Sequence, residues 1–319
     1  MSATMQPIAA QEAAIQTIAG KTSLLSNYAE LMKPRVTSLV VATAWCGYFM
    51  GTMKSGVSSL SWTLLHTLLG IGIVAGGAAA LNQVIERDVD ARMRRTERRP
   101  LPAGRMGTLH AALFGFTLLA GGSIYLAVTT NLLTGYLAFA TAATYLLFYT
   151  PLKQITSLCT FVGAFPGAMP PLLGWTAARG MLEWEGLALF AIVLLWQFPH
   201  FLAIAWIYAE DYASGGIRML PVVQKDGRST TREILLYSTA LIPVSVAPVV
   251  LGMTGGIYFV GAILLSLVFF WVGLRLWRLK LAPSAPQSKK TARQLLQASV
   301  IYLPLLFALM MITALFHSA

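Results

Sequence analysis

The sequence TLLHTLLGIGIVAGGAAALNQV occupies residues 63–84 and contains no formally charged side chain. A helix of this length can cross the apolar core of a bilayer, which takes about 20 residues. Eight further runs of similar character flank it, so we expect nine helices, at 36–53, 63–84, 108–129, 132–150, 158–176, 186–207, 234–252, 256–277 and 294–316. The sequence therefore predicts an all-α, polytopic membrane bundle of nine transmembrane helices.

The composition indicates that a bilayer, rather than water, is the solvent. Of the 319 residues, 56% are hydrophobic and 11% are charged, whereas a soluble domain has about 25% charged residues. The net charge of +11 raises nucleic acid as an alternative partner. The basic residues, however, lie in short loops between apolar runs and not on one polar face. We therefore expect contact with membrane lipid and none with nucleic acid.

We expect a single membrane domain at 31–319, preceded by a flexible cytoplasmic tail at 1–30. The tail is polar and Ala-rich, and it lacks the apolar core of a signal peptide. The run 158–176 differs from the others because it contains Pro166, Pro170 and Pro171. Proline removes a helical hydrogen bond, so we expect this helix to be kinked or broken.

The basic residues also predict the orientation of the chain. The connections after the first, third, fifth and seventh runs contain only Lys54 and Arg179. The remaining Lys and Arg residues gather in the N-terminal tail and around the other loops. Cytoplasmic loops are enriched in Lys and Arg, so we expect the N-terminus inside and the C-terminus outside.

Polar residues gather where the run 63–84 reaches the cytoplasmic side. Asn82, Glu86 and Asp90 are spaced four apart and share one face if the helix continues through them, whereas Asp88 faces elsewhere. Carboxylate and amide oxygens suit Mg²⁺, which shares its remaining sites with water and substrate phosphates. The alternative is that these acidic residues only balance the Arg-rich loop that follows.

A second polar stripe lies at the cytoplasmic end of the run 186–207. Its residues recur at spacings of four, four, four and three, which places them on one helical face: Trp196, His200, Ile204, Tyr208 and Asp211. A lone His in an apolar helix is more often a hydrogen-bonded packing residue than a ligand, so both roles stay open for His200. Two polar sites at the same side of the membrane predict a shared cavity.

The residues Asn82, Glu86 and Asp90, with Arg-Pro-Leu-Pro at 99–102, resemble the first motif of the UbiA superfamily of intramembrane prenyltransferases. Within it, the chain is most similar to the protohaem IX farnesyltransferase family. That similarity covers essentially everything from Lys33 to the C-terminus. It rests on six separate stretches, at 33–37, 93–96, 149–153, 166–171, 199–201 and 211–221.

Two departures from the superfamily pattern bear on the acceptor. Relatives that prenylate aromatic rings carry a second pair of acidic residues spaced four apart, but Asp211 is followed four residues later by Gly215. The continuation of this segment resembles the haem branch. The second departure is Lys153-Gln154-Ile155, where further basic residues are expected after Lys153.

The resemblance implies a UbiA-like fold and the transfer of a farnesyl group from farnesyl diphosphate to haem B. The products are haem O and diphosphate, and haem A synthase or terminal-oxidase assembly in a bacterial cytoplasmic membrane is the expected recipient. Haem B is then a substrate rather than a cofactor. Mg²⁺ on the diphosphate is expected to bind Asn82, Glu86, Asp90 and Asp211. Substrate contacts are expected from Arg95, Arg99, Lys153, Arg218 and Lys225 to phosphate oxygens, Tyr149 and Tyr208 to an allylic carbocation, and His200 to the porphyrin.

Three other functions remain as alternatives. The nearest is a UbiA-type enzyme acting on a quinone precursor, chlorophyllide or lipid. A transporter is a different class, since polar residues within spans also mark transporters, although those are expected near the midplane. A non-catalytic subunit that binds haem would need paired axial His residues within its spans, and only His200 fits.

Overall fold

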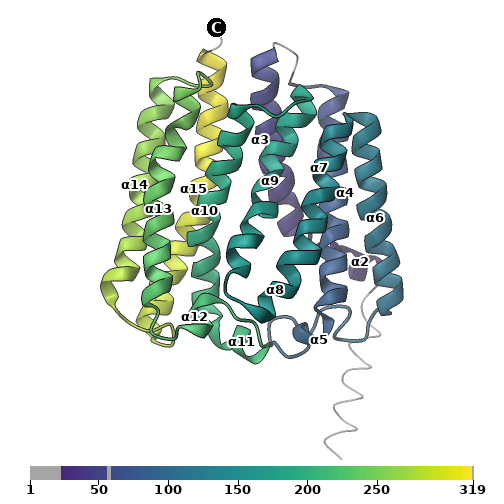
Figure 1. Cartoon of the computed structure of the whole chain (residues 1–319), viewed down its shortest axis with the longest axis vertical. Helices are drawn as coiled ribbons and strands as arrows, with labels where there is room; N and C mark the ends of the chain where they lie inside the picture. Colours follow the sequence, from purple (N-terminus) through teal and green to yellow (C-terminus); the bar gives the residue numbers. More distant parts are fainter. Residues whose placement is uncertain (1–22, 56–58, 318–319) are drawn as a thin grey trace, which may run out of the picture.

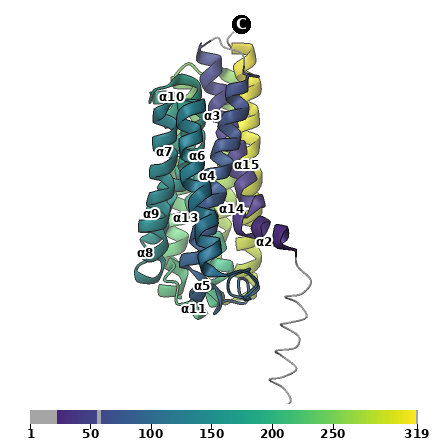
Figure 2. The same cartoon turned by 90° about the vertical axis from the view of Figure 1, so that its right-hand side faces the viewer.

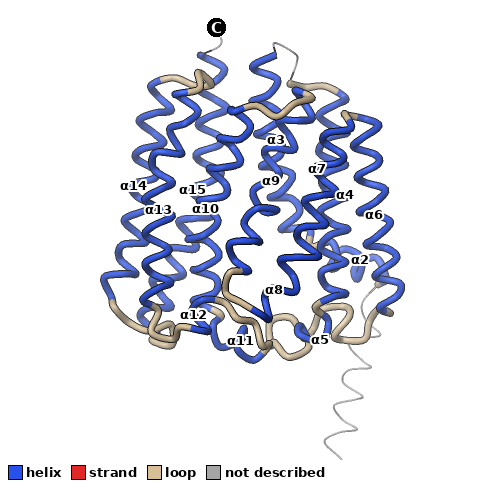
Figure 3. The backbone as a smooth tube through the Cα atoms, in the orientation of Figure 1, coloured by secondary structure: helices blue, strands red, loops and turns tan. Residues whose placement is uncertain are grey.

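The computed structural model describes residues 23–55 and 59–317, and these fold into an upright bundle of helices with no strand among them (Figures 1 and 3). The long helices are α3 (Pro34–Ser55), α4 (Trp62–Ile85), α6 (Thr108–Thr129), α7 (Leu132–Thr144), α9 (Cys159–Arg179), α10 (Trp184–Ile207), α13 (Arg228–Val250), α14 (Gly256–Leu279) and α15 (Pro286–His317). The short helices are α2 (Leu24–Met32), α5 (Arg87–Asp90), α8 (Thr150–Ile155), α11 (Ala209–Ser214) and α12 (Leu220–Val223).

The prediction of an all-α membrane bundle is confirmed. Each of the nine predicted runs is helical, and eight of the helices in the described residues are long and apolar enough to span a bilayer. One of these spans is composite: α7 continues through a π-helical turn, η1 (Tyr145–Tyr149), into α8. The ninth long helix, α9, is not among the eight.

Helix α9 is continuous, so of the two predicted outcomes, a kink or a break, the break is wrong and the kink stays a prediction. Pro166, Pro170 and Pro171 all lie inside one helix from Cys159 to Arg179. Non-ideal backbone is tolerated within a membrane where neighbouring helices cover it. The cover here comes from α3, α7 and α10, all of which contact α9.

The contact between α3 and α9 depends on residues without side chains. A Cβ on Gly174 would lie 1.9 Å from the carbonyl oxygen of Ala44, and one on Gly47 would lie 1.8 Å from that of Pro171. Small residues allow membrane helices to approach closely, and packing then provides the attraction that the hydrophobic effect does not. Cys46 and Cys159 are buried free thiols in these two helices.

The polar segments gather at one end of the bundle. In Figure 1, α5, α8, α11 and α12 lie at the lower end, whereas the C-terminal end of α15 lies at the upper end. Helix α2 is at the lower end too and lies across the bundle rather than along it (Figure 2). Of the predicted tail at 1–30, residues 1–22 lie outside the described residues, and the last part belongs to α2, Leu24–Met32, which contacts α4.

We predict that Gly174→Ala lowers the free energy of unfolding by about 1–3 kcal/mol, because overpacking forces α3 and α9 apart. Gly121→Ala in α6 is the matched control, since a Cβ there meets nothing within 4 Å. The control should keep or slightly raise stability. Thermal unfolding of both variants in the same detergent measures the difference, and equal melting temperatures would refute the close-contact argument.

Candidate functional site

The centre of the site is a ladder of three polar side chains, Asn82, Glu86 and Asp90, which follow one another at a spacing of four residues. Glu86 leaves the helical conformation, with φ −93° and ψ 6°, and ends α4. The four-residue spacing of hydrogen bonds nevertheless continues, because the Glu86 N–H donates to the Asn82 carbonyl at 2.9 Å and the Asp90 N–H donates to the Glu86 carbonyl at 2.7 Å. The ladder residues are 1%, 7% and 1% exposed. Asp88 is exposed and pairs with Arg87, so its predicted separation from the ladder is confirmed.

Each rung of the ladder contacts a cation from a different part of the chain. Lys153 of α8 donates to Glu86 Oε1 at 2.8 Å. Arg99, in the loop after α5, donates from Nη1 to Asp90 Oδ2 at 2.7 Å. Lys33, between α2 and α3, donates to Asn82 Oδ1 at 3.2 Å. Thus Arg99 and Lys153, both predicted to contact the substrate, form ion pairs with the ladder.

Lys33 lies in an environment that disfavours a positive charge. Burial, together with repulsion by Arg99 and Lys153, lowers the pKa of its ammonium group to about 7. The carboxylates of Glu86 and Asp90 act in the opposite direction and raise the pKa of Lys33. An added anion would therefore stabilise the charged form of Lys33.

The oxygen atoms that the ladder offers as ligands suit a magnesium ion that a phosphate also helps to bind. Asp90 Oδ1 is buried and accepts no hydrogen bond within the described residues. Among the residues that the structure describes, no three His, Cys, Asp or Glu side chains form a cluster that could hold a metal by themselves. Mg²⁺ commonly binds one or two carboxylates and completes its shell with water and phosphates. The oxygen donors of Asn82, Glu86 and Asp90 fit that arrangement.

Asp211 lies beside the Arg-rich loop instead of on the ladder. Its Oδ1 accepts the backbone N–H of Arg94 at 2.9 Å, and its Oδ2 lies 3.8 Å from Arg95 Nε without accepting a hydrogen bond. The guanidinium of Arg95 is 5.5 Å from the ring centroids of Tyr208 and Tyr212. The structure therefore groups three of the predicted residues, Asp211, Arg95 and Tyr208, into a second polar cluster.

Lys153 connects the ladder to Tyr149 and to the segment that follows α11. Its ammonium lies 4.4 Å from the ring centroid of Tyr149, and its carbonyl accepts the N–H of Arg218 at 2.7 Å. Tyr149 can lie against α9 because Gly163 faces it, and a Cβ there would be 2.4 Å from the ring. The side chains of Arg218 and Lys225 are exposed, and no ion pair joins either to the ladder in the described residues.

His200 faces α15 rather than the ladder. Its Nδ1 lies 2.8 Å from the Ser299 hydroxyl, and its ring stacks on Trp196 at 4.9 Å. The neighbouring Phe201, not His200, lines an apolar cavity among α3, α4, α7, η1 and α9. The contacts are those of a packing residue, which was one of the two roles that the sequence left open.

An apolar cavity of about 330 Å³ lies among α3, α4, α7, η1 and α9. Most of its lining residues are small or aliphatic, and Tyr145 and Tyr149 add aromatic faces. Lys33 is the single charged residue among those that line it. Because Lys33 also bonds to Asn82, the cavity and the acidic ladder share a residue.

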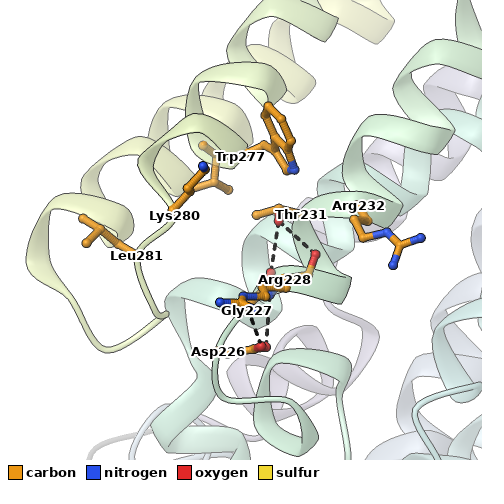
Figure 4. Close-up of a pocket in the computed structure, with 9 residues that line it drawn as sticks. Asp226, Gly227, Arg228, Thr231, Arg232, Trp277, Lys280 and Leu281 are labelled. Atoms are coloured by element: carbon orange, nitrogen blue, oxygen red, sulfur yellow. Dashed lines mark hydrogen bonds and ion pairs between the residues drawn. The ribbon is translucent and has the colours of Figure 1, made fainter.

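A second cavity, of about 300 Å³, lies between α13 and α14, far from α5 in the bundle (Figures 1 and 4). Its lining includes Arg228, Arg232 and Lys280. Figure 4 shows Arg232 turned away from Lys280, and Arg228 is 3.7 Å from Asp226. The cations do not converge there, so this cavity does not reproduce the arrangement at the ladder.

Comparison with known proteins agrees with this geometry. The sequence profile described as "UbiA prenyltransferase family" matches residues 39–300. The chain belongs to the UbiA prenyltransferase family. Its relatives in that family include a protoheme IX farnesyltransferase of Koribacter versatilis, 56% identical over 98% of this chain and 99% of the relative. Another, of Solibacter usitatus, is 47% identical over 90% of this chain and 98% of the relative.

Solved structures of UbiA proteins share the fold. A digeranylgeranylglyceryl phosphate synthase superposes with a TM-score of 0.74 at 18% identity, covering 92% of this chain and 99% of that one. A UbiA homologue from Archaeoglobus fulgidus, bound to GPP and Mg²⁺, gives 0.60 at 16% identity, covering 89% and 99%. The UbiA fold and the multi-pass membrane character of this chain follow.

Sequence reasoning assigned no role to Lys33 and Thr150. Thr150 Oγ1 accepts a hydrogen bond from Asn82 Nδ2 at 3.2 Å and holds its amide. Lys33 stands immediately before α3, where a basic residue precedes an apolar run, and that position was the available signal. Its partner is 49 residues away in the sequence, so the contact itself could not be read from local spacing.

We predict that Lys153→Met destabilises this UbiA protein by about 3 kcal/mol, because it leaves the Glu86 carboxylate buried without its cation. The double variant Glu86→Gln, Lys153→Met should recover part of that loss. Arg87→Gln breaks an exposed pair and should change stability by less than about 0.5 kcal/mol. Unfolding in detergent measures all three, and a single variant as stable as the double would contradict the pairing.

Proposed function

We propose that the chain transfers the farnesyl group of farnesyl diphosphate to haem B and releases haem O and diphosphate. The observation that carries the proposal is the junction of an apolar cavity with a buried cluster of acids and cations at Lys33. One substrate with an apolar tail and an anionic head would fill both. The names of the relatives at 56% and 47% identity support this choice of acceptor and donor.

The cluster can bind diphosphate by exchanging ion pairs. Lys153 and Arg99 now neutralise Glu86 and Asp90. On binding, these cations would turn towards phosphate oxygens, which form short charge-assisted hydrogen bonds with Lys and Arg. Mg²⁺, when bound by Asn82, Glu86 and Asp90, would stabilise the negative charge that develops on the leaving group. Asp211 would act from the second cluster, by holding the Arg94–Arg95 segment.

The chemistry then needs a dry cavity with aromatic faces. The bond between the farnesyl carbon and the phosphate oxygen breaks, and its electron pair stays on the diphosphate. Tyr149 and Tyr145 line the cavity and can stabilise the allylic cation, at about 2 kcal/mol each when desolvated. The vinyl carbon of haem B forms the new C–C bond, and water adds to the resulting cation and loses a proton.

The placement of the polar groups supports an inner-membrane enzyme. The ladder, the Asp211 cluster and their loops lie at one end of the bundle. We infer from the basic loops that this end is cytoplasmic, with the C-terminus outside, in a bacterial cytoplasmic membrane. The exposed Arg218 lies next to Lys153 and could bind a haem propionate at that surface. Haem A synthase or terminal-oxidase assembly would then receive haem O.

We predict that Glu86→Ala and Asp90→Ala each lower kcat/KM by at least about 100-fold, because each removes stabilisation of the leaving group. Diphosphate release, assayed with and without Mg²⁺, measures the loss. Asp88→Asn is the matched control and should retain wild-type turnover, since Asp88 faces solvent. Wild-type turnover in both alanine variants would rule out the metal site.

The acceptor needs an assay of its own. We expect purified enzyme given farnesyl diphosphate and an equal mixture of haem B and 4-hydroxybenzoate to prenylate only haem B. Mass spectrometry identifies the product by the gain of a farnesyl group and a hydroxyl group. A prenylated benzoate would place the chain with the other UbiA enzymes and refute the haem assignment.

A further inference from the structure

Helix α2 is fixed to the site by an arginine that none of the proposed chemistry uses. The side chain of Arg105 is 6% exposed and lies at the end of the loop that carries Arg99. Its Nη1 donates to Asn27 Oδ1 at 2.8 Å and to Glu30 Oε1 at 3.1 Å, and its Nη2 donates to Glu30 Oε2. The planar guanidinium thus forms a bidentate pair with the Glu30 carboxylate.

A second attachment holds the same helix to α4. The side-chain amide of Gln83 donates to the carbonyls of Glu30 at 3.1 Å and Leu31 at 3.0 Å. These are the carbonyls at the end of α2, where a helix lacks internal partners. Gln83 follows Asn82 directly, so the end of α2 is attached next to the first rung of the ladder.

Lys33 follows the last residue of α2, directly after the segment that Arg105 and Gln83 hold. It caps α2 in the left-handed conformation, with φ 50°, which non-glycine residues seldom adopt. Its carbonyl then accepts the N–H groups of Val36 at 2.9 Å and Thr37 at 3.0 Å, in the first turn of α3. The turn directs the Lys33 ammonium onto Asn82, at the mouth of the apolar cavity.

Arg105 also organises the loop that supplies Arg99. Its Nη2 donates to the carbonyl of Arg98 at 2.8 Å, and its backbone N–H donates to that of Pro100 at 2.8 Å. Arg99 lies between these two attachment points and contacts Asp90. One residue therefore contacts α2 and both neighbours of a cation on the ladder, Arg98 through its side chain and Pro100 through its backbone.

We propose that Arg105 is a positioning residue of the diphosphate site: clamped to Asn27 and Glu30, it holds α2 so that Lys33 reaches Asn82. This inference rests on the proposed function, because it assumes that the ladder receives diphosphate. Arg105 itself does not contact the substrate. Loss of the clamp would leave Lys33 in the chain but free to leave the mouth of the cavity.

The test is the binding of farnesyl thiodiphosphate, an unreactive probe, with Mg²⁺ and full-length protein in detergent, measured by calorimetry. We expect Glu30→Gln to weaken binding about tenfold, which corresponds to about 1.4 kcal/mol. Lys33→Met should weaken it by a similar factor. Adding Glu30→Gln to Lys33→Met should cause no further loss, because the clamp acts through Lys33. Glu183→Gln, which changes the Lys54 and Arg179 pairs at the other end, should bind like wild type.

The outcomes separate the two proposals. Wild-type protein that does not bind the probe would refute the proposed function and the inference with it. Tight binding by wild type and by Glu30→Gln alike would refute only the inference. A tenfold loss in both backgrounds would show a general structural effect and also refute it. If Glu30→Gln does not fold, Arg105→Lys, which keeps a cation but cannot form the bidentate pair, repeats the cycle from the other partner. Because it also disturbs the bond to the Arg98 carbonyl, its loss of affinity should be smaller, though not zero, in the Lys33→Met background, and an equal loss in both backgrounds would refute the inference.

Discussion

The structure depends on neutralising two carboxylates that the fold removes from water. Burying an ionised carboxylate costs several kcal/mol unless a cation and hydrogen bonds compensate. Glu86 and Asp90 obtain their cations from α8 and from the loop after α5. These pairings bring separate segments to the end of α4. The arrangement of this end of the bundle is therefore set by charge, whereas the arrangement of the rest is set by packing.

The spans and the ladder could be predicted because both depend on local spacing. Apolar length defines a membrane helix, and residues four apart share a face even where Glu86 interrupts the helix. The continuity of α9 could not be predicted, because prolines are tolerated there only through the cover of other helices, and the packing of α3, α7 and α10 around α9 is not visible in local spacing. The partner of His200 depends on how α10 is rotated against α15, and the stripe itself does not encode that rotation.

Small residues serve two purposes around α9. At Gly174 the absence of a side chain allows the backbones of α3 and α9 to come into direct contact. At Gly163 it provides the space that Tyr149 occupies beside the cavity. The same residue type therefore tightens the bundle in one place and shapes a binding space in another. A sequence motif rich in glycine and proline shows neither purpose without the neighbouring helices.

The pairing at the ladder also fixes its electrostatic balance before any substrate arrives. The carboxylates of Glu86 and Asp90 are paired with Lys153 and Arg99, and the ammonium of Lys33 lies beside them on Asn82. Because its acids are already paired, the ladder gives a bare divalent cation little attraction, whereas its three cations attract a polyanion. Metal and diphosphate would consequently enter as one complex, whose net charge is smaller in magnitude than that of either ion.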